Sequence, residues 1–426
     1  MARGPAASWS CSRPPSNCGV PDAMTASWPT TKTAATTSLD ASSALVPADN
    51  FSRSMTGGAY RVTRINGTRE VLARIALATN DCTATVFQSE PWLAAIGRGL
   101  GRDGRGELVA LDIADASNGE RVALLPLTIA RERRRTVARF ADLEVSDYRG
   151  PLLGPAAPRD KAGERALWAA VKRGLPGVDL IRFEAMPAEI GGRPNPFARR
   201  HEATPARLKG LSVTIGTTVE AMLRDRGKKY RKEAERCFRL LEKQGATKFR
   251  HAETPDEIHR AYAVLEAQQS ARQMAIGQAY VLDQPQYHEF YRDLLITERE
   301  SGFAALFTLE AGSEIVAALM GVVRGGTFTL LRISNGGETW RHLSPGRLIV
   351  IEAMRHFVER GIRTFDMGAG DYPFKRGFGA EETPLFDLVA AGSLRGLPAI
   401  AVARAKAFVR NRPALMAAIG RVRGKG

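Results

Sequence analysis

The order of elements between residues 302 and 375 constrains the fold of this chain more than any single residue does. Three segments rich in aliphatic, aromatic and threonine residues begin at Phe303, Glu314 and Thr327, and glycine-containing turns separate them. This pattern predicts an antiparallel meander of three strands. Apolar residues then recur at helical spacing up to Gly361, which predicts a helix directly after the meander.

The start of that helix is its most informative part. It begins with Ser344, Pro345 and Gly346, and proline suits a first helical turn because its missing N–H has no partner to lose there. The free backbone N–H groups and the positive end of the dipole can bind an anion, so a pyrophosphate would fit. An ordinary capped helix is the alternative. Residues 364–378 then predict a strand running into a glycine-rich turn with charged and phenolic groups just beyond it.

The stretch 344–378 resembles the GNAT acyltransferase superfamily, in particular its CelD/BcsL-like branch of cellulose and exopolysaccharide acetyltransferases. That branch shows a Pro-Gly helix start, a D-x-G-x-G-D strand end, which is residues 366–371 here, and a following basic element. The likeness extends back to residues 231–236, 147–152 and 92–93. It implies an α+β fold of tandem GNAT-like acyl-CoA N-acyltransferase domains, with mixed, mostly antiparallel sheets flanked by helices.

The resemblance also implies acetyl-CoA or another acyl-CoA as co-substrate. Its pyrophosphate would be held at the helix start by Arg341, Ser344, Gly346 and Arg347, although the usual loop of spaced glycines is represented here only by residues 340–346. The strands at 327–334 and 364–367 would form a splayed pair that holds the thioester near backbone N–H groups.

Acyl transfer needs a base for the nucleophile, a donor for the developing oxyanion and a proton for the leaving thiolate. Asp371 is the expected general base, and Tyr372 the expected proton donor. Lys375 is expected to bind a phosphate or a substrate carboxylate, and Arg272 to face the acceptor. The alternatives are that Asp371 caps the turn, Tyr372 packs and Lys375 is solvated.

The chain divides into four predicted parts. Residues 1–57 are rich in Ala, Ser, Thr and Pro and read as a disordered tail, or as translation from an upstream start codon. Residues 58–205 form an N-terminal GNAT-like domain, in which residues 191–205 look like a linker or exposed loop. Residues 206–391 form the C-terminal acyltransferase domain, which opens with one long basic helix from Thr218. Residues 392–426 form a basic amphipathic tail.

Charge and cysteine content narrow the partners and the compartment. The formal net charge of +16 favours anionic partners, whether nucleic acid, an acidic membrane or a phosphate-rich molecule such as CoA. Few aromatic residues lie in the basic segments, so nucleic acid is not expected. The four cysteines show no metal or disulfide spacing, and the six histidines are scattered, so no metal site is expected. A cytoplasmic protein is the simplest interpretation. Its basic tail either packs on the domain as a simple helix or lies on an anionic membrane, which would make the protein peripheral to the inner face.

Three functions stay open. The first is an acyltransferase acting on an amine or hydroxyl of a small molecule or glycan, such as a cell-surface polysaccharide precursor. The second is a Fem-type aminoacyl-tRNA-dependent transferase, which would explain the positive charge but whose long helical-hairpin insertion is not evident between residues 218 and 277. The third is a non-catalytic basic scaffold of a polysaccharide synthase.

Overall fold

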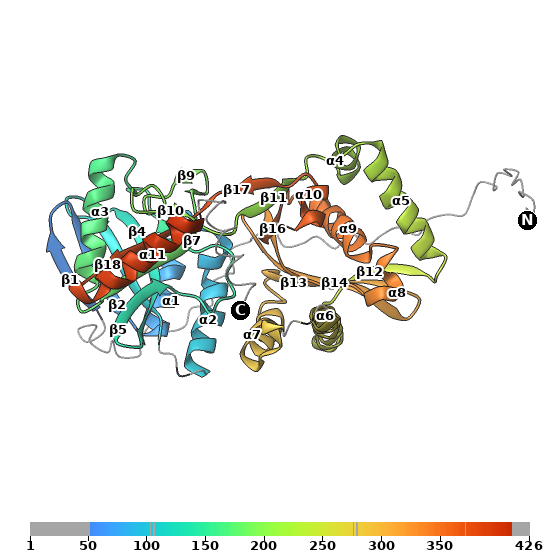
Figure 1. The fold of residues 1–426 in the computed structure, drawn as a ribbon, viewed down its shortest axis with the longest axis horizontal. Coiled ribbons are helices and arrows are strands. Elements are labelled where there is room, and N and C mark those ends of the chain that lie inside the picture. The colour runs from blue at the N-terminus through green and yellow to red at the C-terminus, as the bar shows by residue number, and fades with distance from the viewer. Residues whose placement is uncertain are drawn as a thin grey trace, which may run out of the picture. The chain divides into compact units, whose positions relative to one another are not determined.

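The computed structural model describes residues 52–102, 104, 107–275, 277, 280–370 and 372–410. These residues form two large sheets with helices on their faces (Figure 1). The first sheet has nine strands in the order β1-β2-β3-β4-β5-β7-β18-β10, with β6 paired to β4. Its strands are β1 (Ser52–Gly57), β2 (Tyr60–Asn66), β3 (Val109–Asp115), β4 (Arg121–Glu132), β5 (Arg135–Phe140), β6 (Leu152–Leu153), β7 (Leu180–Pro187), β10 (Thr204–Pro205) and β18 (Leu385–Ala391).

The second sheet has seven strands in the order β12-β13-β14-β15-β16-β11-β17. They are β11 (Gly210–Thr214), β12 (Thr247–His251), β13 (Ala304–Ala311), β14 (Glu314–Arg324), β15 (Thr327–Ile333), β16 (Thr364–Ala369) and β17 (Glu381–Thr383), and a separate hairpin joins β8 (Glu189–Ile190) to β9 (Arg193–Pro194). The predicted three-strand meander is therefore confirmed as β13, β14 and β15.

Helices cover both faces of each sheet. They are α1 (Thr68–Ala78), α2 (Glu90–Arg102), α3 (Lys161–Gly174), α4 (Val219–Asp225), α5 (Lys228–Glu242), α6 (Pro255–Ala275), α7 (Pro285–Thr297), α8 (Gly337–Arg341), α9 (Pro345–Glu359), α10 (Pro373–Gly377) and α11 (Leu397–Arg410), with short 3-10 turns at Val86–Gln88, Val281–Asp283 and Leu394–Gly396. Figure 1 shows α6 and α7 on one face of the second sheet and α9 on the other. The predicted α+β class, with mixed and mostly antiparallel sheets, is confirmed.

The two sheets repeat one plan. In each, an antiparallel meander ends in a strand that pairs in parallel with the strand after a crossover helix: β5 with β7 around α3, and β15 with β16 around α9. The next position is filled by an antiparallel strand, β18 beside β7 and β11 beside β16. Strand β11 precedes α4 directly in the chain, whereas β18 follows the whole second sheet in sequence and returns to complete the first. Strand β18 belongs to the first sheet, although it lies within the segment 206–391 assigned above to the second domain. The division of the chain into four parts stays a prediction.

The apolar cores also join the halves. One core cluster combines residues of α1 and α2 with residues of α6, α7, β13 and β14. At its centre the ring of Trp92 on α2 meets Phe290 on α7 edge to face, with centroids 5.2 Å apart. The other face of the first sheet is covered by α3, and the other face of the second by α4, α5 and α9. Burial on this scale is the main stabilising term for such a fold.

Two expectations about the chain between the sheets are wrong. The single long helix from Thr218 is two helices, because Gly227 adopts φ +90° between α4 and α5 and breaks the helical path. The segment 191–205 is not simply an exposed loop. Asn195 and Phe197 are buried, and the side chain of Asn195 donates to the carbonyl of Pro187 at 3.0 Å, so this segment packs on the first sheet.

Candidate active site

The centre of the candidate site is the place where β15 and β16 part. These two strands pair in parallel only from Thr327↔Thr364 to Thr329↔Asp366. We call the place where this pairing ends the β15–β16 fork. Just beyond it β15 carries a bulge, because Leu330 pairs with Gly321 whereas Arg332 pairs with Met320. Bulges re-aim backbone groups and are common next to active sites. The predicted strand pair is therefore present, and its pairing ends after three residues.

Helix α9 follows β15 after the short helix α8, which the sequence did not predict. Ser344, its N-cap, adopts the left-handed conformation (φ 51°, ψ 49°), and its side chain makes no capping hydrogen bond. Pro345 opens the helix as expected. The atoms nearest to a Cβ added to Gly346 would be the Asn335 amide nitrogen at 3.7 Å, the Ile333 Cδ1 at 3.9 Å and the Asn335 Cβ at 4.0 Å, all at ordinary van der Waals distances. The first turn therefore has room beside its backbone, as an anion site requires.

The two predicted pyrophosphate arginines lie in different surroundings. Arg347, in the first turn of α9, places its guanidinium 5.2 Å from the ring centroid of Tyr230 on α5. Arg341 is exposed on α8 and pairs with Glu338 at 3.1 Å. An exposed pair of this kind contributes little to stability, so Arg341 can turn to another anion at small cost.

Two carboxyl groups from opposite halves meet beside β16. Asp366 Oδ1 accepts a hydrogen bond from the Tyr148 hydroxyl at 2.7 Å and another from the Gly368 N–H at 2.8 Å. Asp147 accepts from the backbone N–H of Ala369. Gly368 has φ +73°, and a Cβ there would lie 2.2 Å from Asp147 Oδ2, so only glycine allows the Asp147 carboxyl this close to the strand.

Burial makes both carboxyl groups weaker acids than usual. It raises the pKa of Asp147 from the ordinary 3.8 to about 6, and the neighbouring Asp366 raises it further. Burial likewise raises the pKa of Asp366 to about 6, against the opposing effect of the Tyr148 hydrogen bond. A carboxyl group whose pKa is close to neutral is suited to accept and release a proton.

The glycine-rich turn brings one of the predicted residues, Lys375, close to this carboxyl pair. Lys375 is buried, and its ammonium donates to the carbonyls of Gly368 at 3.2 Å and Ala369 at 3.0 Å. The solvated alternative for Lys375 is therefore wrong. Tyr372 is 55% exposed, with the Lys375 ammonium 5.2 Å from its ring centroid. Asp371, the expected general base, lies outside the described residues.

A buried arginine next to the β15–β16 fork was not predicted from the sequence. Arg332, only 2% exposed, extends from the bulge of β15 toward α6, where it donates to the Gln269 side chain and to the Tyr262 hydroxyl, each at 2.8 Å. It also pairs with Glu266 at 3.4 Å. These three contacts fix α6 to the bulge, and the Nη2 of Arg332 is buried without a hydrogen-bond partner among the described residues. Arg272 is exposed in the last turn of the same helix.

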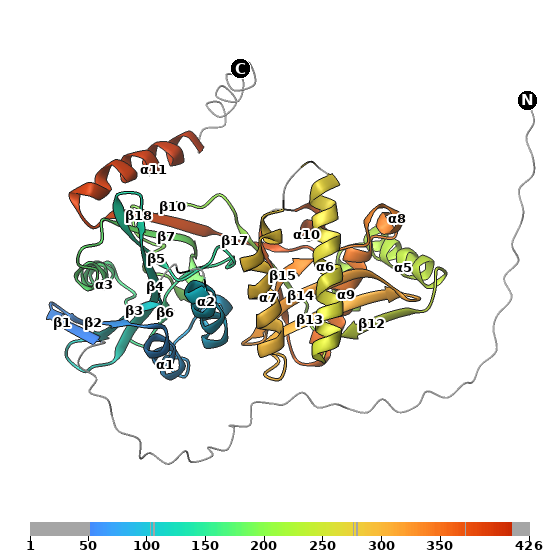
Figure 2. The same ribbon diagram turned by 90° about the horizontal axis from the view of Figure 1, so that it is seen from below.

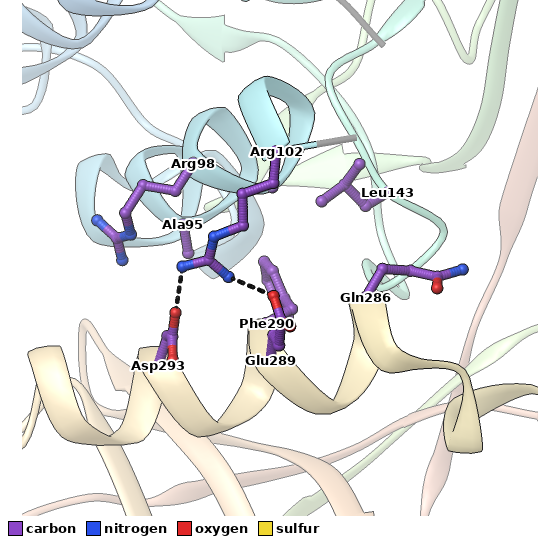
Figure 3. A pocket seen from close by; sticks show the side chains of 9 residues that line it. Ala95, Arg98, Arg102, Leu143, Gln286, Glu289, Phe290 and Asp293 are labelled. Carbon is purple, nitrogen blue, oxygen red and sulfur yellow. Dashed lines mark hydrogen bonds and ion pairs between the residues drawn. The ribbon is translucent and has the colours of Figure 1, made fainter. Parts of the chain in front are cut away.

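A pocket between α2 and α7 is separate from this site. Its lining includes Arg98 and Arg102 of α2 and Gln286, Glu289 and Asp293 of α7. Figure 3 shows Arg102 reaching across to Glu289, at 3.1 Å, and to Asp293. Its charged groups are thus engaged in holding the two helices together. Among the described residues no cluster of His, Cys, Asp or Glu could hold a metal ion, and no described helix is long and apolar enough to cross a membrane.

Comparison with known proteins bears on the same segment. The family model of the acetyltransferase (GNAT) domain matches residues 228–376, which include α9, the β15–β16 fork and Lys375. The chain therefore contains a GNAT acetyltransferase domain. No curated protein matches the sequence.

Several solved structures align with the chain at low sequence identity. FemX aligns over 77% of this chain and 97% of its own, with 14% identity and a TM-score of 0.52. A tandem GNAT protein from the clavulanic acid biosynthesis pathway aligns over 78% and 99%, with 15% identity and a TM-score of 0.41. A GCN5-related N-acetyltransferase from Sphaerobacter thermophilus aligns over 78% and 96%, with 13% identity and a TM-score of 0.38. At these identities the FemX similarity is one of fold alone.

Proposed function

We propose that this protein is an acyltransferase that takes the acyl group of acetyl-CoA, or another acyl-CoA, and transfers it to an amine or hydroxyl of an acceptor such as a cell-surface polysaccharide precursor. The observation that carries the proposal is the fork between β15 and β16 followed by the uncapped start of α9. The pyrophosphate would bind the first turn of α9, with Gly346 and Ser344 supplying backbone and Arg347 and Arg341 supplying charge.

The thioester would then lie in the fork, with its carbonyl against backbone N–H groups of the β15 bulge. When the acceptor attacks the carbonyl carbon, negative charge develops on the carbonyl oxygen, and fixed N–H donors stabilise it. A base takes the proton of the acceptor, the C–S bond breaks, and the thiolate leaves as a thiol after taking a proton. Tyr372 is the proposed donor of that proton, because it stands at the end of β16 with an exposed hydroxyl-bearing ring.

Two carboxylates compete for the role of base. Asp371 keeps the role that its place in the turn suggests, and Asp147 is the alternative among the described residues. Asp366 is less suited, because Oδ1 already accepts from Tyr148 and Gly368. Turnover of Asp371→Asn and Asp147→Asn, each compared with the wild-type chain, separates the two: the base is the residue whose change abolishes turnover without abolishing acetyl-CoA binding. Lys375 is proposed to hold the turn through the Gly368 and Ala369 carbonyls, and Arg272 to contact the acceptor.

The competing function is aminoacyl transfer from tRNA. The fold similarity to FemX favours keeping this candidate, while residues 218–277 contain α4, α5, β12 and α6 in place of one long helical hairpin. Calorimetric titration of the full chain with acetyl-CoA, and in parallel with bulk tRNA, distinguishes the two. Saturable binding of acetyl-CoA supports the proposal. Salt-sensitive tRNA binding without acetyl-CoA binding would refute it in favour of the tRNA-dependent reaction or the scaffold.

A further inference from the structure

A cluster of arginines gathers where the first sheet meets the last helix. The hairpin between β4 and β5 carries Arg131, Arg133, Arg134 and Arg135, and the fold brings Arg395 beside them around one open depression that Glu132 also lines. Glu132 is paired with Arg139 at 2.6 Å. The depression therefore presents five guanidinium groups and one carboxylate that is already engaged.

Specific contacts fix the two distant segments together. The guanidinium Nε of Arg135 donates to the carbonyl of Arg395 at 2.8 Å. Asp179 at the start of β7 accepts from the Thr136 N–H at 2.9 Å and from the Ser393 hydroxyl, which ties the turn before α11 to the start of β5. Because the end of β18 pairs with the start of β7, the chain leaves the sheet at that point and enters α11 next to the hairpin (Figure 2).

The outer face of α11 is largely apolar between residues 397 and 405, where the structure describes its side chains. Leu394 in the turn before the helix is 83% exposed, and Leu397 and Val402 are 51% and 54% exposed. The other exposed residues between 397 and 405 are Pro398, Ala401, Arg404 and Ala405, whereas Ala399, Ile400 and Ala403 are half-buried. A helix on the surface of a soluble protein ordinarily turns its charged side to water. Here the side turned to water is apolar except for Arg404, and the hairpin arginines lie beside it.

We infer that the hairpin arginines and the outer face of α11 together form a docking surface for an anionic lipid bilayer. Leucine and valine side chains enter the boundary between headgroups and acyl chains, while guanidinium groups remain at the level of the lipid phosphates. A purely apolar partner would not match the arginines, and a purely polyanionic partner would leave the apolar face exposed. The sequence after Arg410 adds Arg412, Arg421, Arg423 and Lys425 with no acidic residue, so its charge has the same sign.

Vesicle sedimentation of the full chain tests this inference. Vesicles of phosphatidylcholine alone are compared with vesicles of equal parts phosphatidylcholine and phosphatidylglycerol, at about 0.1 M salt, where surface charges still act over roughly 10 Å. We expect binding to the anionic vesicles and little to the neutral ones. Equal binding to both, or binding to neither, would overturn the inference, while the proposed acyl transfer would be unaffected because it does not depend on this surface.

Two variants test the two halves of the surface. The triple change Arg131→Gln, Arg133→Gln and Arg134→Gln is expected to weaken binding to anionic vesicles about tenfold or more. Its matched control is Lys228→Gln, Lys232→Gln and Arg239→Gln on the exposed side of α5, which removes the same charge and is expected to leave binding nearly unchanged. Equal losses in both triples would show general attraction to a basic protein and would overturn the inference.

The second variant carries Leu397→Asp and Val402→Asp. Both side chains are exposed, so the fold should tolerate the change, and an unchanged urea midpoint checks this. We expect vesicle binding to be lost about as completely as in the hairpin triple. If the double variant binds vesicles as tightly as the wild-type chain, and bulk tRNA competes for the same arginines, the surface is a site for soluble polyanions and the lipid inference is wrong.

Discussion

The Asp147 and Asp366 carboxyl groups show how one pair of residues can favour chemistry over stability. Each is held beside β16 by backbone N–H donors, yet burial raises the pKa of each to about 6. An ordinary carboxyl group titrates near 3.8. Groups that are costly to ionise in the folded state are common at active sites, where a proton must move close to neutral pH.

This geometry predicts how stability changes with pH. Between about pH 4 and pH 6 the folded chain binds protons on Asp147 and Asp366 that the unfolded chain has already released. The free energy of unfolding should therefore fall as the pH rises through that range and level off above it. Asp147→Asn should remove part of this fall and raise the free energy of unfolding at pH 7 by about 1–3 kcal/mol. Urea denaturation at pH 4.5 and pH 7 checks the prediction; a variant that is less stable at pH 7 than the wild-type chain would contradict it.

At the scale of single residues, the contacts of Tyr148 and Arg332 could not be predicted from the sequence. Tyr148 bonds to Asp366 across 218 residues, and no local pattern reports a pairing between segments that far apart. Arg332 lies in a segment with strand periodicity, in which a charged residue normally faces water. The bulge after Leu330 shifts the alternation and turns its side chain onto α6. A bulge has no reliable signature in a single sequence.

At the scale of elements, the segment from β13 to β16 was predicted well because each piece carries its own signal. Glycine-containing turns separate the strands, and α9 begins at Pro345. The division between α4 and α5 was missed because the residues on both sides continue a helical pattern, and only the positive φ of Gly227 breaks it. The packed segment 191–205 was missed because its buried Asn195 and Phe197 lie among prolines, glycines and arginines that ordinarily indicate a loop.

The bulged β14–β15 pair leads to an element-scale prediction. A Cβ on Gly321 would lie 2.3 Å from both the Phe328 ring and the Thr329 carbonyl oxygen, so Gly321→Ala must push β14 and β15 apart. We expect a loss of about 1–3 kcal/mol in the free energy of unfolding. Thermal denaturation measures it, with Gly101→Ala in α2 as the control, because a Cβ there meets nothing within 4 Å. Equal stability of the two variants would mean that the β14–β15 contact is looser than described.

At the scale of the whole molecule, β18 and a shared core join the two halves. Strand β18 follows the second sheet in the sequence but completes the first sheet beside β7, and one apolar core includes α2 and α7 from the two halves. The repeated plan of the two halves was suggested by the layout of predicted elements. The return of β18 to the first sheet could not be predicted, because periodicity identifies a strand but not its neighbour.

The return of β18 and the shared core predict that the two halves unfold together. Trp92 and Trp168 lie in the first half and Trp340 in the second, so fluorescence samples both sheets. Fluorescence and far-UV circular dichroism should give coincident urea transitions for the full chain. A chain that ends at residue 384 lacks β18. We expect its first sheet not to fold, although the residues removed are all at the C-terminal end of the sequence. Two separate transitions, or a truncated chain with an intact first sheet, would contradict this prediction.

The central claim is that the first turn of α9 binds the pyrophosphate of an acyl-CoA. The most direct test is calorimetric titration of acetyl-CoA into the full chain and into Gly346→Val, with Gly101→Val as the control. The free protein has space beside Gly346, so the variant should fold, but its side chain would occupy the place of the anion. We predict saturable binding to the wild-type and control chains, weakened about tenfold or more in Gly346→Val. Unchanged binding in Gly346→Val, or no binding to the wild-type chain, would contradict the account.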